Sequence, residues 1–180
     1  MTNLVSIKSL GELKKDKDID SWLRSKGIKV DFFDGKSLPF IITIEKDFTQ
    51  SLLEKIESAV QSFLNLDSKY REKISGLVYE NYKEMLGAAD IKPLNVKEKS
   101  DIWKYVHPQE IYISQRNGGD EDEDIYIQVA CNCDWEEEHG LQLVFKQGRK
   151  ITRVSEQDGH LTNSDAFDTP DSEDKLLSAF

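Results

Sequence analysis

The stretch Ile125–Val154, with the sequence IYIQVACNCDWEEEHGLQLVFKQGRKITRV, decides the fold of this chain. Apolar side chains occupy every second position of its first part, namely Ile125, Ile127, Val129, Cys131 and Cys133. This period of two predicts a strand with one buried face. The alternation returns at Leu141, Leu143 and Phe145, and a third apolar segment begins near Ile151. We therefore predict a meander of three strands.

Two turns connect the predicted strands. Gln147-Gly148 forms the second turn, because glycine readily adopts the positive φ of a tight hairpin. The first turn is the corner Asp134–Gly140, whose sequence is DWEEEHG. We expect this corner to be a polar loop that ends at glycine and holds its charges in water.

The chain before the meander predicts another hairpin and two helices. Asp34-Gly35 lies between two apolar runs, which is a strong hairpin signal. Apolar residues at helical spacing predict one helix from Asp47, with Gln50 completing a capping box, and a second helix from Asp67. The link between them is short, so the two helices should form an antiparallel helical hairpin.

The order of these elements predicts an α+β fold with mainly antiparallel strands. An N-terminal hairpin or meander precedes the central helical hairpin, and the C-terminal meander follows it. The connections between neighbouring strands look too short for parallel crossovers. We expect residues 1–160 to form a single domain. Residues 161–180 are rich in Ser, Asp, Thr and Asn and predict an acidic, loosely ordered tail.

The chain is acidic, with 34 Asp and Glu against 24 Lys and Arg and a net charge of −10. Such a charge disfavours nucleic acid and anionic membranes as partners and favours basic ones. The alternative is that the charge serves solubility only. The sequence contains no long apolar run and no signal-peptide pattern at its start. Its two cysteines are too few for a disulfide framework, so we expect a reduced, cytoplasmic protein.

An acidic loop is the first candidate site, and it comprises Asp120, Glu121, Asp122, Glu123 and Asp124. Calcium takes six to eight oxygen ligands, but the loop lacks the ligand spacing of an EF-hand. The simpler interpretation is a solvated hairpin loop whose like charges prevent edge pairing. As a charged surface, it is also a candidate for binding a basic partner.

Cys131 and Cys133 raise the question of a zinc site. Structural zinc needs four Cys or His ligands, usually in closely spaced pairs, and none of the three histidines has such a spacing. Both cysteines fall on the apolar face of the predicted strand, where a free cysteine packs as a small hydrophobic residue. We therefore predict a core role for them and no metal or cofactor.

The corner holds the most function-like cluster, namely Asp134, Glu136, Glu137, Glu138 and His139. A histidine beside carboxylates can act as a general base. However, consecutive carboxylates in a turn point in different directions, and the chain has no GxSxG elbow, P-loop or HExxH motif. We therefore expect a structural corner or a binding surface. Trp135 is the tryptophan that we expect to be partly exposed and to anchor an interface.

The run Cys133–Leu141, CDWEEEHGL, resembles the C-D-W-(D/E)-x-E-H-G-L signature of an uncharacterised bacterial domain family. Further similar features include LGEL from Leu10 and VHP from Val106, so the resemblance extends from about Leu10 to Asp158. Members of that family often resemble immunity or accessory proteins encoded beside toxins. The resemblance implies no catalytic residues. The acidic loop and the acidic tail of this chain depart from the family pattern.

Together, these observations predict a non-enzymatic binding protein. Its expected partner is a basic protein, such as a toxin domain that it would block as an immunity protein, and its expected binding surfaces are the acidic loop and the corner. The alternative is an enzyme, or a protein that binds a small ligand or a cation, that uses Asp134, Glu138 and His139. The sequence does not determine the oligomeric state.

Overall fold

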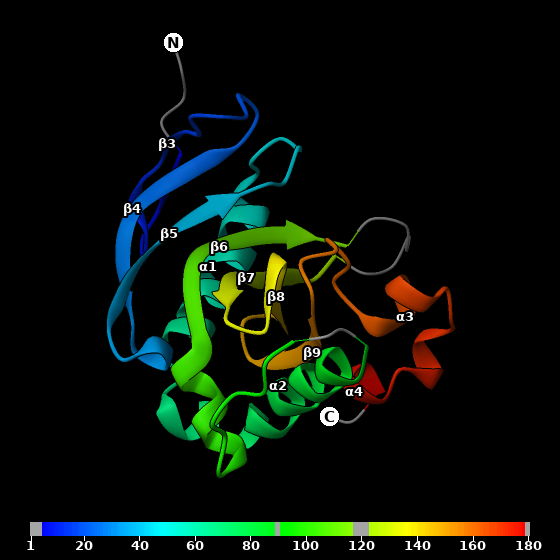
Figure 1. Cartoon of the computed structure of the whole chain (residues 1–180). Coiled ribbons are helices and arrows are strands. Elements are labelled where there is room, and N and C mark those ends of the chain that lie inside the picture. Colours follow the sequence, from blue (N-terminus) through cyan, green and yellow to red (C-terminus); the bar gives the residue numbers. More distant parts are fainter. Residues whose placement is uncertain (1–4, 89–90, 117–122, 179–180) are drawn as a thin grey trace.

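A seven-stranded sheet forms the centre of the computed structural model (Figure 1), which describes residues 5–88, 91–116 and 123–178. The strands follow the chain order across the sheet: β3 Lys14–Lys15, β4 Leu23–Val30, β5 Lys36–Ile42, β6 Val106–Gln115, β7 Ile125–Cys133, β8 Glu136–Lys146 and β9 Lys150–Ser155. A small hairpin of β1 (Ser6–Ile7) and β2 (Gly11–Glu12) precedes the sheet. The predicted α+β class is confirmed.

The meander of β7, β8 and β9 is the best predicted part of the fold. Both pairs are antiparallel, and the alternate residues from Ile125 to Cys133 lie in the main core. The turn between β8 and β9 has positive φ at Gln147 (51°) and at Gly148 (67°). Two consecutive residues with positive φ match the twist of a tight hairpin. Strict alternation therefore identified the inward face correctly.

One strand pair is parallel, which the sequence analysis did not expect. β5 and β6 pair in parallel at Phe40 with Ile111 and Ile42 with Ile113. The connection between them contains α1 (Gln50–Leu64), α2 (Ser68–Ala88) and the 3-10 helix η2 (Lys99–Tyr105). A parallel pair needs a long crossover, and the helical hairpin supplies one. The strand connections were judged too short because the helices were considered separately from the strands that they join.

The two long helices begin at side-chain caps. Thr49 caps α1, because its hydroxyl oxygen accepts a hydrogen bond from the backbone N–H of Leu52 (3.2 Å). The predicted cap, Asp47, lies two residues too early. Asp67 does cap α2, since its Oδ1 accepts from the N–H groups of Lys69 (3.0 Å) and Tyr70 (3.1 Å). Each cap satisfies backbone donors that have no partner within the helix.

The main core lies between the helices and the inner face of the sheet. The ring of Phe32 lies at its centre and makes edge-to-face contacts with Phe33, Trp103 and Phe145 at centroid distances of 4.7, 5.7 and 5.7 Å. Phe32 and Phe145 are fully buried. Burying such a side chain contributes roughly 1.5–3 kcal/mol, so this aromatic cluster fixes the helices on the sheet.

The C-terminal segment packs on the opposite, outer face of the sheet. It comprises α3 (Asn163–Phe167), the 3-10 helix η3 (Asp171–Glu173) and α4 (Lys175–Ser178), which lie beside β9 in Figure 1. Leu161 joins Tyr126 and Val144 in a second, smaller core cluster. The composition of residues 161–180 predicted a loosely ordered tail here. The structure differs, because polar side chains of the segment are buried and hydrogen bonded.

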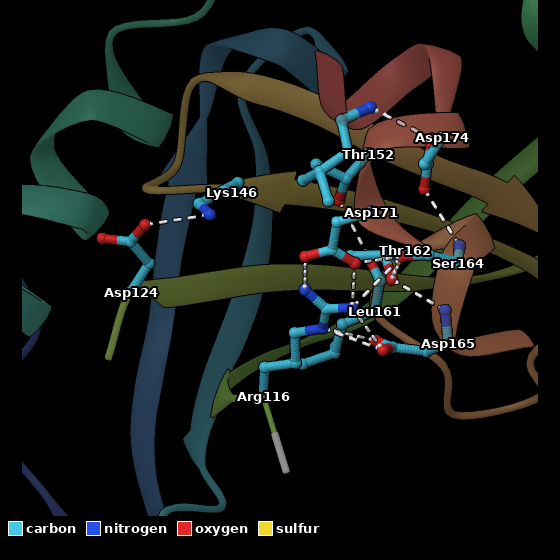
Figure 2. Close-up of polar contacts among 11 residues, drawn as sticks. Arg116, Asp124, Lys146, Thr152, Leu161, Thr162, Ser164, Asp165, Asp171 and Asp174 are labelled. Carbon is cyan, nitrogen blue, oxygen red and sulfur yellow. Dashed lines mark hydrogen bonds and ion pairs between the residues drawn. The ribbon is translucent and has the colours of Figure 1, made fainter. Parts of the chain in front are cut away.

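Arg116 holds this C-terminal segment to the end of β6 (Figure 2). Its guanidinium donates to Asp165 from Nε (2.8 Å) and Nη2 (2.6 Å) and to both oxygens of Asp171 (2.6 Å each). Asp174, which is 4% exposed, accepts from the backbone N–H of Ser164 (3.0 Å). Asp165 and Asp171 belong to the acidic composition that suggested disorder. Both carboxylates bind the guanidinium of Arg116, which lies 49 and 55 residues earlier in the chain.

No helix in the described part of the chain combines the length and the apolar character that a bilayer span requires.

Candidate functional site

The acidic corner is built at the turn between β7 and β8. Only Asp134 and Trp135 form the turn, and β8 begins at Glu136. The N–H of Asp134 donates to the carbonyl oxygen of Tyr105 (3.1 Å), which ties the turn to the end of η2. The expected polar loop from Asp134 to Gly140 is therefore wrong. Most of the corner is strand, so its side chains have defined directions.

Trp135 is buried, and the prediction of a partly exposed anchor is wrong. Its relative exposure is 2%. The indole Nε1–H donates to Asn81 Oδ1 on α2 (3.0 Å), and its ring lies edge-to-face against Tyr82 with centroids 6.0 Å apart. A buried indole needs such a partner for its N–H group. Trp135 thus positions the corner against α2 and presents almost no surface to a partner.

The carboxylates of the corner divide into bound and exposed groups. Glu136 is 11% exposed, and its carboxylate accepts from the backbone N–H groups of Glu138 (3.1 Å) and His139 (2.6 Å). Asp134 Oδ1 lies 2.7 Å from His107 Nε2. The side chain of Glu138 is 84% exposed. Glu136 therefore shapes the strand, whereas Glu138 and the exposed Glu137 form the accessible charge.

A hollow of about 770 Å³ lies next to the corner. Its apolar wall comes from the end of α2 and the segment that follows, with Met85, Ile91, Pro93 and Leu94. Its acidic wall comes from Asp134 and Glu136–Glu138, and Lys92 adds one positive charge. We call this surface the corner hollow. An apolar depression with charged residues at its margin has the composition of a protein-binding surface.

The acidic loop lies at the other end of β7. Asp120, Glu121 and Asp122 lie outside the described residues. Glu123 contacts Lys55 (2.5 Å), and this cation lowers the pKa of the Glu123 carboxyl. Asp124 contacts Lys146 (3.0 Å).

The nine residues of β7 separate the loop from the corner. A strand of this length spans roughly 26 Å at about 3.3 Å per residue. The two predicted binding surfaces are therefore distinct, and the described part of the loop already has basic partners in the chain.

One group of potential metal ligands occurs among the residues that the structure describes. Ligand atoms of Glu136, His139 and Glu156 lie within 4.8 Å of one another. A set of one imidazole and two carboxylates suits a divalent transition metal with further positions open. Both Glu136 oxygens already accept backbone hydrogen bonds. These bonds give the carboxylate a structural role whether or not a metal binds.

The cysteines lie in the core, as the sequence indicated. Cys131 and Cys133 are free and buried. Burial raises the pKa of both thiols, that of Cys133 to about 11. A thiol that stays protonated at neutral pH is a poor nucleophile and a poor metal ligand.

The negative charge is concentrated in the second part of the sequence. Residues 1–100 contain 16 acidic and 17 basic side chains, whereas residues 101–180 contain 18 acidic and 7 basic ones. The excess of 11 acidic residues in the second part exceeds the net charge of the whole chain. The corner, the acidic loop and the C-terminal segment all belong to this part, which holds the excess of acidic residues.

Sequence reasoning missed a second hollow on the outer face of the sheet. It measures about 820 Å³ and lies between the sheet and the C-terminal segment. We call it the outer-face groove. Its walls include Trp22, Glu45, Gln128, His160 and Asp168. These residues come from distant parts of the chain and form no local motif, so only the folded structure brings them together.

The fold and the corner hollow define an α+β domain with an acidic surface beside an apolar depression. The family model that matches residues 9–161 is described as Domain of unknown function (DUF6985), and the chain belongs to this family. This confirms the predicted membership of a domain family without an assigned function. No curated protein and no solved structure matches the chain. Helix α3 and everything after it lie beyond the matched residues.

Proposed function

We propose that this protein is a non-enzymatic binding protein whose partner is a basic protein, and that the corner hollow makes the contact. The observation that carries the proposal is the pairing of exposed carboxylates at Glu137 and Glu138 with an apolar depression of about 770 Å³. Apolar area supplies affinity at the centre of an interface, while charge at its margin steers the partner and selects it.

The structure of the corner favours binding over catalysis. Glu136 is committed to backbone N–H groups, and Asp134 is committed to His107. The side chain of Glu138 is 84% exposed and stands in solvent, away from the enclosed setting that is typical of a catalytic acid or base. Buried Trp135 makes the corner rigid through Asn81. A rigid, preorganised surface loses less entropy on association.

The specific form that we propose is an immunity protein that blocks a cationic toxin domain. Its support is the resemblance of the run Cys133–Leu141 to a bacterial family whose members often resemble toxin-associated immunity proteins, together with the excess of acidic residues after residue 100. An acidic inhibitor of a basic protein associates faster through electrostatic steering, and added salt weakens this effect.

The experiment is affinity capture from a lysate of the source cells at low and at moderate salt, with the bound proteins identified by mass spectrometry. The proposal expects a basic protein that is retained at low salt and depleted at moderate salt. The purified partner is then assayed for an activity that this protein inhibits. Retention of an acidic or neutral partner without salt dependence would contradict the proposal.

Cation binding at Glu136, His139 and Glu156 is the second candidate function, because their ligand atoms converge within 4.8 Å. Ligands of one divalent ion at about 2.1 Å lie roughly 3.4–4.2 Å apart, so small movements of the exposed His139 and Glu156 would complete the site. A zinc titration by calorimetry tests it with His139→Ala, and with His160→Ala as the matched control. Equal heats for both variants and the wild type would exclude this site.

A further inference from the structure

We propose that the outer-face groove is a second binding site, which takes the ammonium or guanidinium group of a lysine or arginine side chain from a basic segment. The groove lies on the face of the sheet opposite α1 and α2 and is separate from the corner hollow. The proposal rests on the hydrogen-bonding capacity of its floor and on the charges of its walls.

The amide of Gln128 is oriented by a chain of buried hydrogen bonds. Gln142 is fully buried, and its Nε2 donates to Asp158 Oδ1 (2.7 Å) and to the carbonyl oxygen of His160 (3.1 Å). Both partners only accept, because a carbonyl oxygen carries no proton and the carboxylate of Asp158 forms an ion pair with Arg153. Gln142 Oε1 must therefore accept, and it does so from Gln128 Nε2 (2.6 Å). Gln128, which lines the groove, therefore keeps its Oε1 acceptor and one Nε2–H for other partners.

A pair of hydroxyl groups adds further acceptors to the floor of the groove. Thr43 Oγ1 donates to the carbonyl oxygen of Ile113 (3.2 Å) and lies 2.8 Å from Ser114 Oγ. Either hydroxyl can donate in the contact between Thr43 and Ser114, and each oxygen keeps a lone pair that can accept. Thr43, Ser114 and Gln128 all line the groove. Its floor therefore offers acceptors, which suit a ligand that donates.

The walls of the groove carry an excess of negative charge. Glu45, Asp165 and Asp168 line it, together with the cations Lys46 and Arg116. Arg116 is already surrounded by carboxylates, since it binds Asp171 as well as Asp165. Counting Asp171, four carboxylates face two cations. A positive group entering the groove meets this net negative charge as well as the acceptors of the floor.

Trp22 supplies an aromatic wall. Its side chain lines the groove and is half-buried, and its ring lies edge-to-face with Tyr112 at a centroid distance of 5.9 Å. The face of an indole attracts ammonium and guanidinium groups. The acceptors, the carboxylates and the aromatic ring are three independent features, and all three favour the same kind of ligand. An anionic ligand would be repelled by the carboxylates and the acceptors, and a purely apolar ligand would use the aromatic ring alone.

The test is a titration of the whole protein with acetylated hexalysine and hexaarginine peptides at low salt, followed by calorimetry and by tryptophan fluorescence. The groove variant is Glu45→Gln with Asp168→Asn. Both substitutions keep the shape, and asparagine tolerates the left-handed backbone at residue 168 (φ 51°). The matched control is Glu12→Gln with Glu72→Gln, two exposed residues that do not line the groove. The control removes the same charge.

We expect saturable binding to the wild type and to the control variant, and an affinity about tenfold lower for the groove variant. Gln128→Met, which removes the oriented acceptor without changing the charge, should also weaken binding. Trp22→Phe should abolish the fluorescence response. An equal loss in the groove and control variants would show a general charge effect and overturn the proposal, as would an absence of saturable binding. Either result leaves the corner hollow untouched, because its test uses other residues.

Discussion

The guanidinium of Arg116 forms a bidentate contact with the carboxylate of Asp171, with two nitrogen to oxygen distances of 2.6 Å. This contact lowers the pKa of Asp171 to about 2 from an ordinary value of 3.8, and the hydroxyl of Ser164 adds to the effect. It links the end of β6 to the C-terminal segment, which lies beyond the residues that the family model matches. It is therefore one of the contacts that hold that segment on the sheet.

The Asp171 contact should make the attachment of the C-terminal segment depend on pH. A carboxyl whose pKa is lower in the folded state stabilises the fold above its unfolded pKa, and this contribution disappears as the pH falls through the folded value. We expect the attachment to be constant above about pH 4 and to weaken as the pH falls to about 2.

Carbon-detected NMR titration of the Asp171 carboxyl measures this pKa directly. The variant Arg116→Met should return the midpoint towards 3.8 and loosen the segment, seen as faster exchange of the Ser164 amide. A titration midpoint of Asp171 near 3.8 in the wild type would contradict the ion pair between Arg116 and Asp171.

Gly148 should be intolerant of substitution for two reasons. Its φ of 67° strains any other residue, and a Cβ there would overlap the backbone carbonyl oxygen of Ala59 on α1. Strain costs about 1 kcal/mol and the overlap about 1–3 kcal/mol, so Gly148→Ala should lose about 3 kcal/mol in the free energy of unfolding. Gly35→Ala is the control, because Gly35 has φ 75° but open space around it. Equal losses in urea denaturation would disprove the overlap.

The start of α1 gives a test of cap assignment. Thr49→Ala removes the oxygen that accepts from Leu52 N–H, so the free energy of unfolding should fall by about 1 kcal/mol. Asp47→Ala should change it little, since Asp47 contacts Thr49 through its backbone carbonyl only. Thermal denaturation of both variants distinguishes the two residues. A larger effect at Asp47 would restore the cap expected from the sequence.

The thiols of Cys131 and Cys133 should be unreactive towards disulfide reagents in the folded protein. Burial raises the pKa of Cys131 and of Cys133, so neither forms much thiolate at neutral pH. A colorimetric disulfide reagent should react only as fast as the protein opens, and Cys133 should react first because burial raises its pKa less. Full reactivity in denaturant is the control. A rapid stoichiometric reaction without denaturant would show that the strand is accessible.

The features that the sequence predicted correctly depend on residues close together in the chain, and the features that it missed depend on residues far apart. Alternation along β7 and the Gln147-Gly148 turn are local signals, and both were interpreted correctly. The parallel pairing of β5 with β6 depends on a crossover of two helices, which no short window shows. The composition of the C-terminal segment predicted disorder. Its carboxylates contact Arg116 only in the folded chain, so the sequence did not show this stabilising interaction.

The candidate site shows the same limit. The acidity of the corner was evident in the sequence, but the burial of Trp135 depends on Asn81, which is 54 residues away. The outer-face groove combines Trp22, Glu45, Gln128 and Asp168 from separate segments. No periodicity relates residues at such separations. Exposure at a turn and the walls of a hollow are therefore properties of the packing, whereas net charge and strand faces are properties of the sequence.

The most direct test of the binding function is to compare two charge-reversed proteins in the capture experiment at low salt. One carries Glu137→Lys with Glu138→Lys at the corner hollow, and the other carries Glu12→Lys with Glu72→Lys, at exposed positions elsewhere. Both change the net charge equally. We predict that the basic partner is lost from the corner variant and retained by the control variant. Equal retention or equal loss in the two variants would contradict the assignment of the corner hollow as the binding surface.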